Sequence, residues 1–437
     1  MSATSVRTRR PAVLLLCCVA LLTACGSSGG GTAVLRADPV TVPPADPART
    51  AATAAATGAF GLDLLHTLTA DPGAAGRNLV LSPSGLATVL AMVLPGARGA
   101  TAEELAGALH TELTPEQYAL ATGALNRPGA PAGQDGPVLR QSDDLWAQQG
   151  YPIDRHYLGV LAAAFGTGVH TADFGKDPEG ARKAVNGVVE KATEGRIKNL
   201  FGPGQINRGT RLALTDALYL KADWAEPFTA AKSADRPFHR LDGTGSAVPT
   251  MAQTTRLRYA EGSGGILGEP WQAVELRYAG STLAMDLVVP AQGGFEAFRK
   301  GLDQAELDRI LGSLTERTVD LTLPKFHFDT ANELTPALQA LGVKAAFGAA
   351  ADLSGIPGPG ADGALAISTV VQKATVQVDE QGTVAAVGSG VGMDVMAAPA
   401  PANPVELHID RPFLFLIRDT ATGRPLFLGQ VTDPAAR

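Results

Sequence analysis

The sequence predicts an α+β fold with large mixed sheets. Its strand-like segments are too many for a regular β-α alternation, which argues against a doubly wound sheet. No period of about 20 to 50 residues recurs, which excludes a repeat array. The 437 residues are 45% hydrophobic and 18% charged, which is enough apolar material for one large core or two ordinary ones.

The first 24 residues predict an export signal. Basic residues precede the apolar run AVLLLCCVALL, and LTAC follows at residues 22–25. The run is too short for a stable membrane span. LTAC resembles the bacterial lipobox, in which the cysteine is lipidated and becomes the first residue after cleavage, so Cys25 is the predicted lipidation site. An ordinary signal peptide cut near Ala24 is the alternative.

The composition after the signal predicts a tethered domain. Residues 25–57 are rich in Gly, Ser, Ala, Pro and Thr, as in a flexible tether, and residues 58–437 form the expected domain. All three cysteines lie in the signal or at its end, so we expect no disulfide and no Cys-based metal site. We expect export across the cytoplasmic membrane of a bacterium and a lipid anchor on the extracellular side.

Charge and motifs exclude several classes of function. The formal net charge is −7 and the pI is near 5.6, which gives no basic field for nucleic acid. Residues 58–437 contain no G-x-S-x-G elbow, and the chain has no phosphate-binding loop of the Walker type and no H-E-x-x-H. The seven histidines show no ligand spacing, and GSGVG at 388–392 is not followed by an amphipathic helix. We therefore expect neither an enzyme nor a bound metal or cofactor.

Three helices are predicted near the start of the domain, and capping residues define where the second and third begin. A first helix is expected where Phe60, Leu64, Leu65 and Leu68 lie on one helical face. Ser82 is suited to cap a helix with Pro83 at its first position, and Pro95-Gly96 should stop it. That helix is apolar nearly all round and should be buried. Thr101, with Glu104 three residues later, predicts a capping box for the next helix.

The remaining elements follow from local patterns. Strands are expected at 139–148, 210–224, 281–290, 317–328 and 365–377, helices at 177–200 and 331–343, and a pair of strands within 411–434. Between the last two strand regions, residues 378–404 form a long segment of small residues. A loop of this length is uncommon unless it is functional or disordered.

Several long motifs resemble the serpin family. They are NLVLSPSGLATVLAMVLPGARGATAEEL, LTDALYLKADWAEPF, VPTMAQT, LPKFHFDTANELTPALQALGVKAAFGAAADLSGI, VDEQGTVAA and RPFLFLIRDTATGRPLFLGQVTDP, in family order. The resemblance runs from about residue 58 to residue 434. It implies a single domain with three β-sheets, about nine helices and an exposed reactive-centre loop. Most serpins inhibit serine or cysteine proteases by offering that loop as bait.

The sheet-opening region departs from the family at two positions. The family usually has Asn where this chain has Asp216, and often His where it has Gln372. The resemblance implies that these side chains pair where the main sheet opens, together with Ser82, and that Trp224 lies at the top of the opening. In the covering helix, Val188 stands where the family usually has Trp.

The resemblance also assigns the long segment as the reactive loop, with its hinge at Glu380, Gly382, Thr383, Val384, Ala385, Ala386, Val387 and Gly388. Period two places Thr383 and every second residue to Met393 on one face, which suits a core, and small residues on the other. Glycines cost about 0.5–1 kcal/mol each in a strand, so slow insertion and substrate-like behaviour remain an alternative. A disordered Gly/Ala linker is another.

Counting the family's usual 14 positions from Gly382 predicts Met396-Ala397 as the reactive bond. Val395-Met396 and Ala397-Ala398 are alternatives, because the distance from Met396 to Pro412 is somewhat long for the family. Met suits the pockets of elastase-, chymotrypsin- or subtilisin-like proteases. No Arg or Lys occurs between Lys373 and Arg411, which makes trypsin-like targets unfavourable.

The resemblance thus implies a monomeric suicide-substrate inhibitor that forms a covalent acyl complex with a serine protease. It contacts the membrane only through its lipid anchor. A non-inhibitory serpin that acts as a binding or carrier protein at the cell surface is the main alternative. A lipidated solute-binding protein is a third possibility, which the lack of two-domain α/β alternation weakens.

Overall fold

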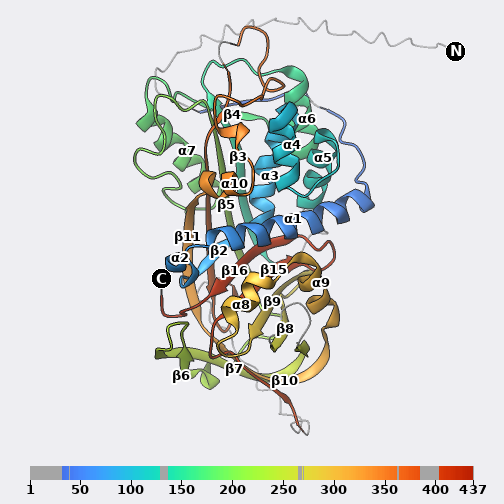
Figure 1. Cartoon of the computed structure of the whole chain (residues 1–437), viewed down its shortest axis with the longest axis vertical. Helices are drawn as coiled ribbons and strands as arrows, with labels where there is room; N and C mark the ends of the chain where they lie inside the picture. The colour runs from blue at the N-terminus through green and yellow to red at the C-terminus, as the bar shows by residue number, and fades with distance from the viewer. Residues whose placement is uncertain are drawn as a thin grey trace, which may run out of the picture.

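The protein is described by a computed structural model that covers residues 32–38, 40–127, 136–263, 268, 270–361, 364–383 and 403–436. This part of the chain contains ten α-helices and two β-sheets (Figure 1). The helices are α1 (Pro47–Leu68), α2 (Pro72–Ala75), α3 (Pro83–Val93), α4 (Gly99–Ala108), α5 (Pro115–Asn126), α6 (Arg155–Phe165), α7 (Pro178–Ala192), α8 (Phe295–Gly301), α9 (Gln304–Ser313) and α10 (Thr335–Ala340).

The first sheet, called the main sheet below, has seven strands in the order β1-β4-β3-β5-β13-β12-β11. Its central strands β5 and β12 are parallel to each other and pair directly along much of their length. The strands are β1 (Ala33–Leu35), β4 (Val169–Ala172), β3 (Val138–Gln148), β5 (Leu212–Asp223), β13 (Gly382–Thr383), β12 (Ile367–Val378) and β11 (Phe326–Glu333).

The second sheet has nine strands and unites two of the three sheets that the sequence led us to expect. The long strand β7 pairs with β6 and β10 and then, near its end, with β8. Its 18 residues therefore make the two hydrogen-bonded networks continuous. The strands are β14 (Val405–His408), β10 (Thr315–Pro324), β7 (Gly245–Gly262), β8 (Trp271–Arg277), β9 (Leu283–Pro290), β15 (Phe413–Asp419), β16 (Pro425–Val431), β2 (Leu79–Leu81) and β6 (Ala234–His239).

Helix α3 lies between the two sheets, in contact with β3, β5 and β16. The predicted cap is confirmed: the Ser82 side-chain oxygen accepts a hydrogen bond from the Gly85 N–H at 3.1 Å, and Pro83 occupies the first turn. Every residue of this helix is buried. Because α3 packs against β3 and β5, it lies directly beneath the region where the main sheet is expected to open.

Helix α7 covers the opposite face of the main sheet (Figure 1). Its buried face, with Val185 and Val189, packs in one cluster with Ala213 and Ala217 of β5. Val188 is partly buried against the same cluster. The small alanines of β5 thus lie beneath the helix, whereas the leucines of β5 belong to the clusters around α3 and the second sheet.

The N-terminal part of the expected tether contains regular structure. Ala33 pairs with Thr171 as β1 joins the edge of the main sheet, and α1 begins at Pro47 after Asp46, which caps it by accepting hydrogen bonds from two backbone N–H groups. Composition does not separate the two states here, because an alanine-rich segment suits a helix as well as a linker, and three residues are enough for β1 to pair at the edge of the sheet.

The capping box predicted at Thr101 and Glu104 is wrong. Helix α4 begins at Gly99, and the Thr101 hydroxyl accepts a hydrogen bond from the Asp352 N–H at 2.9 Å. The Glu104 carboxylate accepts hydrogen bonds from the N–H groups of Lys344 and Ala345, both at 2.7 Å. Both side chains therefore cap a distant segment, which the local sequence cannot reveal.

Among the described helices, none combines the length and the apolar character that crossing a bilayer requires.

Candidate functional site

The hinge begins as a strand inside the main sheet. Gly382 and Thr383 form β13 and pair antiparallel with Asp223 and Ala222 of β5, while Thr383 also pairs with Val378 of β12. Thr383 is 1% exposed. A Cβ on Gly382 would lie 2.0 Å from the Ala222 carbonyl oxygen, so only glycine fits this approach. We call the line along which β5 and β12 pair the seam. At one end of the seam, the chain thus already separates the two strands.

Two stacked aromatic rings hold this first part of the hinge. The rings of Trp224 and Tyr278 stack at a centroid distance of 4.6 Å with an interplanar angle of 12°. The Tyr278 and Thr383 hydroxyl oxygens lie 2.5 Å apart, and burial raises the pKa of Tyr278, which keeps its hydroxyl protonated. Trp224 donates its indole N–H to the Asp379 carbonyl and its backbone N–H to the Gln381 carbonyl, at 3.0 and 2.7 Å.

Glu380, in the turn before β13, is held in place by three polar contacts. Its carboxylate forms an ion pair with Lys325 at 2.5 Å and accepts the Ser233 hydroxyl at 2.6 Å. Its carbonyl accepts the Phe228 N–H at 2.9 Å. Burial on its own would raise the pKa of Glu380, but the hydrogen bonds from Lys325 and Ser233 outweigh it and hold that pKa below the ordinary value.

Glu380→Gln is expected to lower the free energy of unfolding by about 1–3 kcal/mol near pH 7, the usual contribution of hydrogen bonds to a charged group. Because the pKa of Glu380 is lowered in the folded state, its ionised carboxylate stabilises the protein at pH values above the ordinary glutamate pKa. This contribution is lost as the pH falls through the folded-state pKa. The Tm difference between the unaltered chain and the variant should therefore shrink toward zero at acidic pH. A difference that is equally large at pH 7 and at about pH 4 would contradict this role.

Farther along the seam, three of the predicted residues meet. Gln372 of β12 lies directly opposite Asp216 of β5 and donates its side-chain amide to the Asp216 carboxylate and to the Ser82 carbonyl, the latter at 2.8 Å. Its amide oxygen accepts the Ser82 N–H at 3.0 Å. All three residues are buried. Gln372 therefore ties β12 to both β5 and the start of α3.

A fourth residue of this cluster, Asp143, was missed by the sequence reasoning. It lies on β3 directly opposite Asp216, and it accepts a hydrogen bond from the Gln141 side chain. Burial and the nearby Asp216 raise the pKa of Asp143 well above its ordinary value. Burial likewise raises the pKa of Asp216 to about 6, although Gln372 opposes the shift. Only the strand register brings these two acids together.

Arg424 supplies the positive charge near this pair. Burial lowers the pKa of Arg424 to about 10, against the opposing effect of Asp143, so the guanidinium is charged at neutral pH. It donates to the Gln141 side-chain oxygen at 2.8 Å. Gln141 therefore links Arg424 to Asp143.

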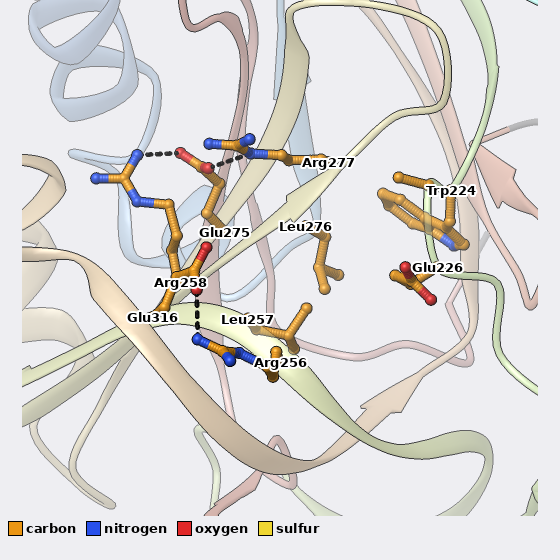
Figure 2. A pocket seen from close by; sticks show the side chains of 10 residues that line it. Trp224, Glu226, Arg256, Leu257, Arg258, Glu275, Leu276, Arg277 and Glu316 are labelled. Atoms are coloured by element: carbon orange, nitrogen blue, oxygen red, sulfur yellow. Dashed lines mark hydrogen bonds and ion pairs between the residues drawn. The ribbon is translucent and has the colours of Figure 1, made fainter. Parts of the chain in front are cut away.

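A cavity of about 190 Å³ opens beside Trp224, between the end of β5 and strands β7 and β8. Figure 2 shows the side chains of Arg258 and Arg277 converging on Glu275, with Trp224 on the far side of the cavity. Glu275 is fully buried and also pairs with Arg418 at 3.0 Å. This charged cluster joins β7, β8 and β15, and Tyr278, which contacts Thr383, directly follows β8.

The other predicted site residues fall outside the described residues. They are Cys25, the reactive bond Met396 and Ala397, and the hinge residues Val384, Ala385, Ala386, Val387 and Gly388. Besides Asp143, the sequence reasoning missed Tyr278 and Lys325. Lys325 lies in the quoted motif LPKF, but nothing local connects it with Glu380. Within the described residues, no cluster of three or more His, Cys, Asp or Glu side chains could hold a metal ion.

The fold and the site together define the class of protein as an α+β domain in which the start of an adjoining loop pairs between two parallel central strands. Comparison with known proteins places the chain within this class. Its sequence matches the model of the family described as Serpin (serine protease inhibitor) over residues 55–434. The chain therefore belongs to the serpin family.

Individual relatives agree with this assignment. An uncharacterized serpin-like protein of Thermococcus kodakarensis is 35% identical over 365 residues, covering 82% of this chain and 81% of that protein. Plasminogen activator inhibitor 1 of Neovison vison is 33% identical, over 82% of this chain and 88% of its own. The crystal structure of Serpin48 from the insect Tenebrio molitor is 28% identical, with a TM-score of 0.74 over 87% of this chain and 98% of that one.

Proposed function

We propose that this chain is a single-use inhibitor of serine proteases that traps its target by inserting the cleaved reactive loop between β5 and β12. The observation that carries the proposal is β13: Gly382 and Thr383 already pair with both strands, whose remaining lengths pair with each other. Insertion needs no change of register, because β13 already forms the first residue pairs with β5 and β12 and the inserted loop would continue them.

Continuing this register assigns a place to each loop residue in the inserted state. Six positions beyond Thr383 is Ser389, and six positions before Ala222 on β5 and Val378 on β12 are Asp216 and Gln372. Residues directly opposite one another have side chains on the same face. The Ser389 hydroxyl would therefore replace the direct Asp216–Gln372 hydrogen bond with bonds of its own.

The same register explains the small residues of the loop. Gly388 and Gly392 would come opposite Ala217 and Ala213, which lie in the cluster beneath α7. That face has little room for larger side chains unless the helix moves. On the other face, Val387 and Val391 would join the core that already contains Leu214 and Leu218.

Insertion supplies the inhibitory step. The protease serine attacks the reactive bond and forms an acyl-enzyme, and the loop then carries the attached protease along β5, whose 12 residues span about 40 Å. We propose that this displacement distorts the oxyanion hole, so that the acyl bond is not hydrolysed. Relatives that are named as inhibitors, including the leukocyte elastase inhibitor of Sus scrofa at 31% identity, support protease inhibition over a carrier role.

The test is to incubate the purified chain with elastase-, chymotrypsin-, subtilisin- and trypsin-like proteases and to separate the products on denaturing gels. A covalent complex that survives SDS is expected with one or more of the first three. Cleavage of the loop with no complex, against every protease, would instead favour the carrier role.

The reactive bond is predicted to be Met396-Ala397. Complexes that break down should release a C-terminal fragment of 41 residues, Ala397 to Arg437, which mass spectrometry identifies. Met396→Arg should shift inhibition toward trypsin-like proteases, because their acidic pocket then finds a positive side chain. A fragment that starts before Asp394 or after Pro399 would overturn the assignment.

The anchor is a separate proposal that rests on the LTAC motif. Cys25→Ser should block lipidation, so the variant should appear in the soluble extracellular fraction or remain unprocessed in the membrane. Immunoblots of fractionated cells that express each form measure this. Equal membrane retention of a processed Cys25→Ser variant would contradict a lipid anchor.

A further inference from the structure

Two carboxyl groups and one amide form a continuous row across the seam of the main sheet. Asp143 on β3 lies opposite Asp216 on β5, which in turn lies opposite Gln372 on β12. We call these three residues the acid row. Its side chains share the face that is covered by α3, where a Cβ on Gly85 would lie 2.2 Å from the Asp216 Oδ1 atom. No larger residue or bridging group fits between α3 and this carboxylate.

The charges around the row do not balance when both acids are ionised. Arg424, in the turn between β15 and β16, is the basic side chain that faces the pair, and Asp419, the last residue of β15, is a further acid that interacts with Arg424. Gln141, Asn126 and Ser82 contribute only neutral groups. Two carboxylates and one guanidinium leave one negative charge, which a buried site disfavours strongly.

The remaining charged neighbours point away from the row. Asp144 follows Asp143 on β3 and projects from the opposite face, where it pairs with His170 of β4 at 3.2 Å. Lys373 follows Gln372 on β12 and pairs with Asp329 at 3.0 Å. Helix α3 carries no titratable side chain. Neither neighbouring pair can therefore neutralise the excess charge directly.

Two buried carboxyl oxygens that lack hydrogen-bond partners indicate how the excess negative charge of the acid row is balanced. Oδ1 of Asp143 and Oδ1 of Asp216 are both buried without a hydrogen-bond partner in the described structure. A proton shared between the two carboxyl groups would satisfy both oxygens and remove the excess charge. The raised pKa values of Asp143 and Asp216 are consistent with such a proton.

The pair also has a route for proton exchange. Asp143 and Gln141 line a cavity of about 440 Å³ between α3, α5, α6 and β3, and Arg127 lies at the same cavity. Water that enters this cavity reaches Asp143 without the sheet having to open. The proton can therefore equilibrate with solvent while β5 and β12 remain paired.

We propose that the acid row is a pH-sensitive latch on the main sheet: the seam between β5 and β12 stays closed while Asp143 and Asp216 share a proton, and it loosens when that proton is lost. Loss of the proton leaves a buried negative charge beside the seam. Opening the seam admits water or, on the proposed function, the Ser389 hydroxyl, and either stabilises the ionised form.

The sign follows from the raised pKa values. The closed state binds more protons than the opened state, so its advantage is fully present below the ordinary aspartate pKa of about 4 and is lost as the pH rises from there through about 6. Where the closed state holds one additional proton, the opening equilibrium changes by about tenfold for each pH unit.

Hydrogen exchange of the intact, uncleaved chain tests the latch without any protease. Mass spectrometry follows peptides from β5 and β12 from about pH 4.5, near the ordinary aspartate pKa, to about pH 8.5, after correction for the intrinsic pH dependence of amide exchange. We expect the opening equilibrium of these peptides to rise at least about tenfold from the lowest to the highest pH. Peptides from β6 and β10, which contain neither a residue of the row nor Arg424, should change far less.

Variants assign the effect to the row. Asp216→Asn, which places the amide usual in the family at this position, should abolish the pH dependence, because Arg424 then balances the one remaining acid. Asp143→Asn should do the same. Asp144→Asn and His170→Gln, on the opposite face of β3 and β4, are matched controls that should retain it.

The outcomes separate this inference from the proposed function. A seam whose exchange does not depend on pH in the unaltered chain overturns the latch, and so does a pH dependence that survives in Asp216→Asn. Because exchange needs no protease, a working latch in a chain that forms no protease complex would refute only the inhibitory function. A protease complex with a pH-independent seam would refute only the latch.

Discussion

Thr383→Arg is expected to convert the protein from an inhibitor into a substrate while leaving it folded. Thr383 is almost completely buried between β5 and β12 and shares a hydrogen bond with Tyr278. An unpaired arginine charge in this buried place costs about 3–5 kcal/mol, so we expect β13 to lie outside the sheet in the uncleaved variant. The cost then opposes the insertion step, when residue 383 must enter the sheet again. Since each 1.36 kcal/mol corresponds to about tenfold in rate, insertion should slow by about 100-fold or more.

The measurement is the ratio of SDS-stable complex to cleaved, released chain when the variant meets a protease that the unaltered chain traps. Folding should survive, because β13 contributes only two residues to the main sheet. Thr229→Arg is a matched control, since Thr229 is exposed and its side chain makes no capping hydrogen bond. Undiminished complex formation by Thr383→Arg would count against insertion through this seam.

Cleavage within the loop is expected to raise Tm by about 10 °C or more. Once cut, the loop is free to enter along the full length of β5, where the register brings Met393 opposite Leu212 at the far end. The new central strand gains ladder hydrogen bonds on both sides and buries Val387, Val391 and Met393. For a chain of this size each kcal/mol of stabilisation shifts Tm by about 1–3 °C, so several kcal/mol are required.

Limited proteolysis at the loop followed by calorimetry measures the shift. Cleaved Thr383→Arg is the informative comparison, because the same bond is cut but the first inserted residue is unfavourable, so its Tm should rise much less. An unchanged Tm after cleavage of the unaltered chain would favour the carrier role. It would also show that the loop glycines weaken the inserted strand enough to cancel its gain.

Much of this protein is specified by local sequence. Ser82, Pro83 and the apolar run after them define α3 and its burial, because the cap and the all-round hydrophobic pattern each act within a few residues. The same holds for β5 and β12, because the local sequence of each segment predicts a strand without reference to its partner. The expectation that Asp216 and Gln372 lie near each other came from the resemblance to serpins, and the structure places them in contact.

Other features exist only because distant segments meet. Asp143 sits in a strand-like segment with no sign of its partner, and only the antiparallel register of β3 and β5 sets it against Asp216. Thr101 and Glu104 fit a local capping box, yet they cap a segment about 240 residues away, because the backbone N–H groups exposed there compete for the same oxygens. The Ala-rich part of the expected tether becomes β1 and the start of α1 for the same reason. Sequence alone determines which conformations a segment favours, whereas the pairing of charges, caps and strand edges depends on which segments the tertiary fold brings within hydrogen-bonding distance.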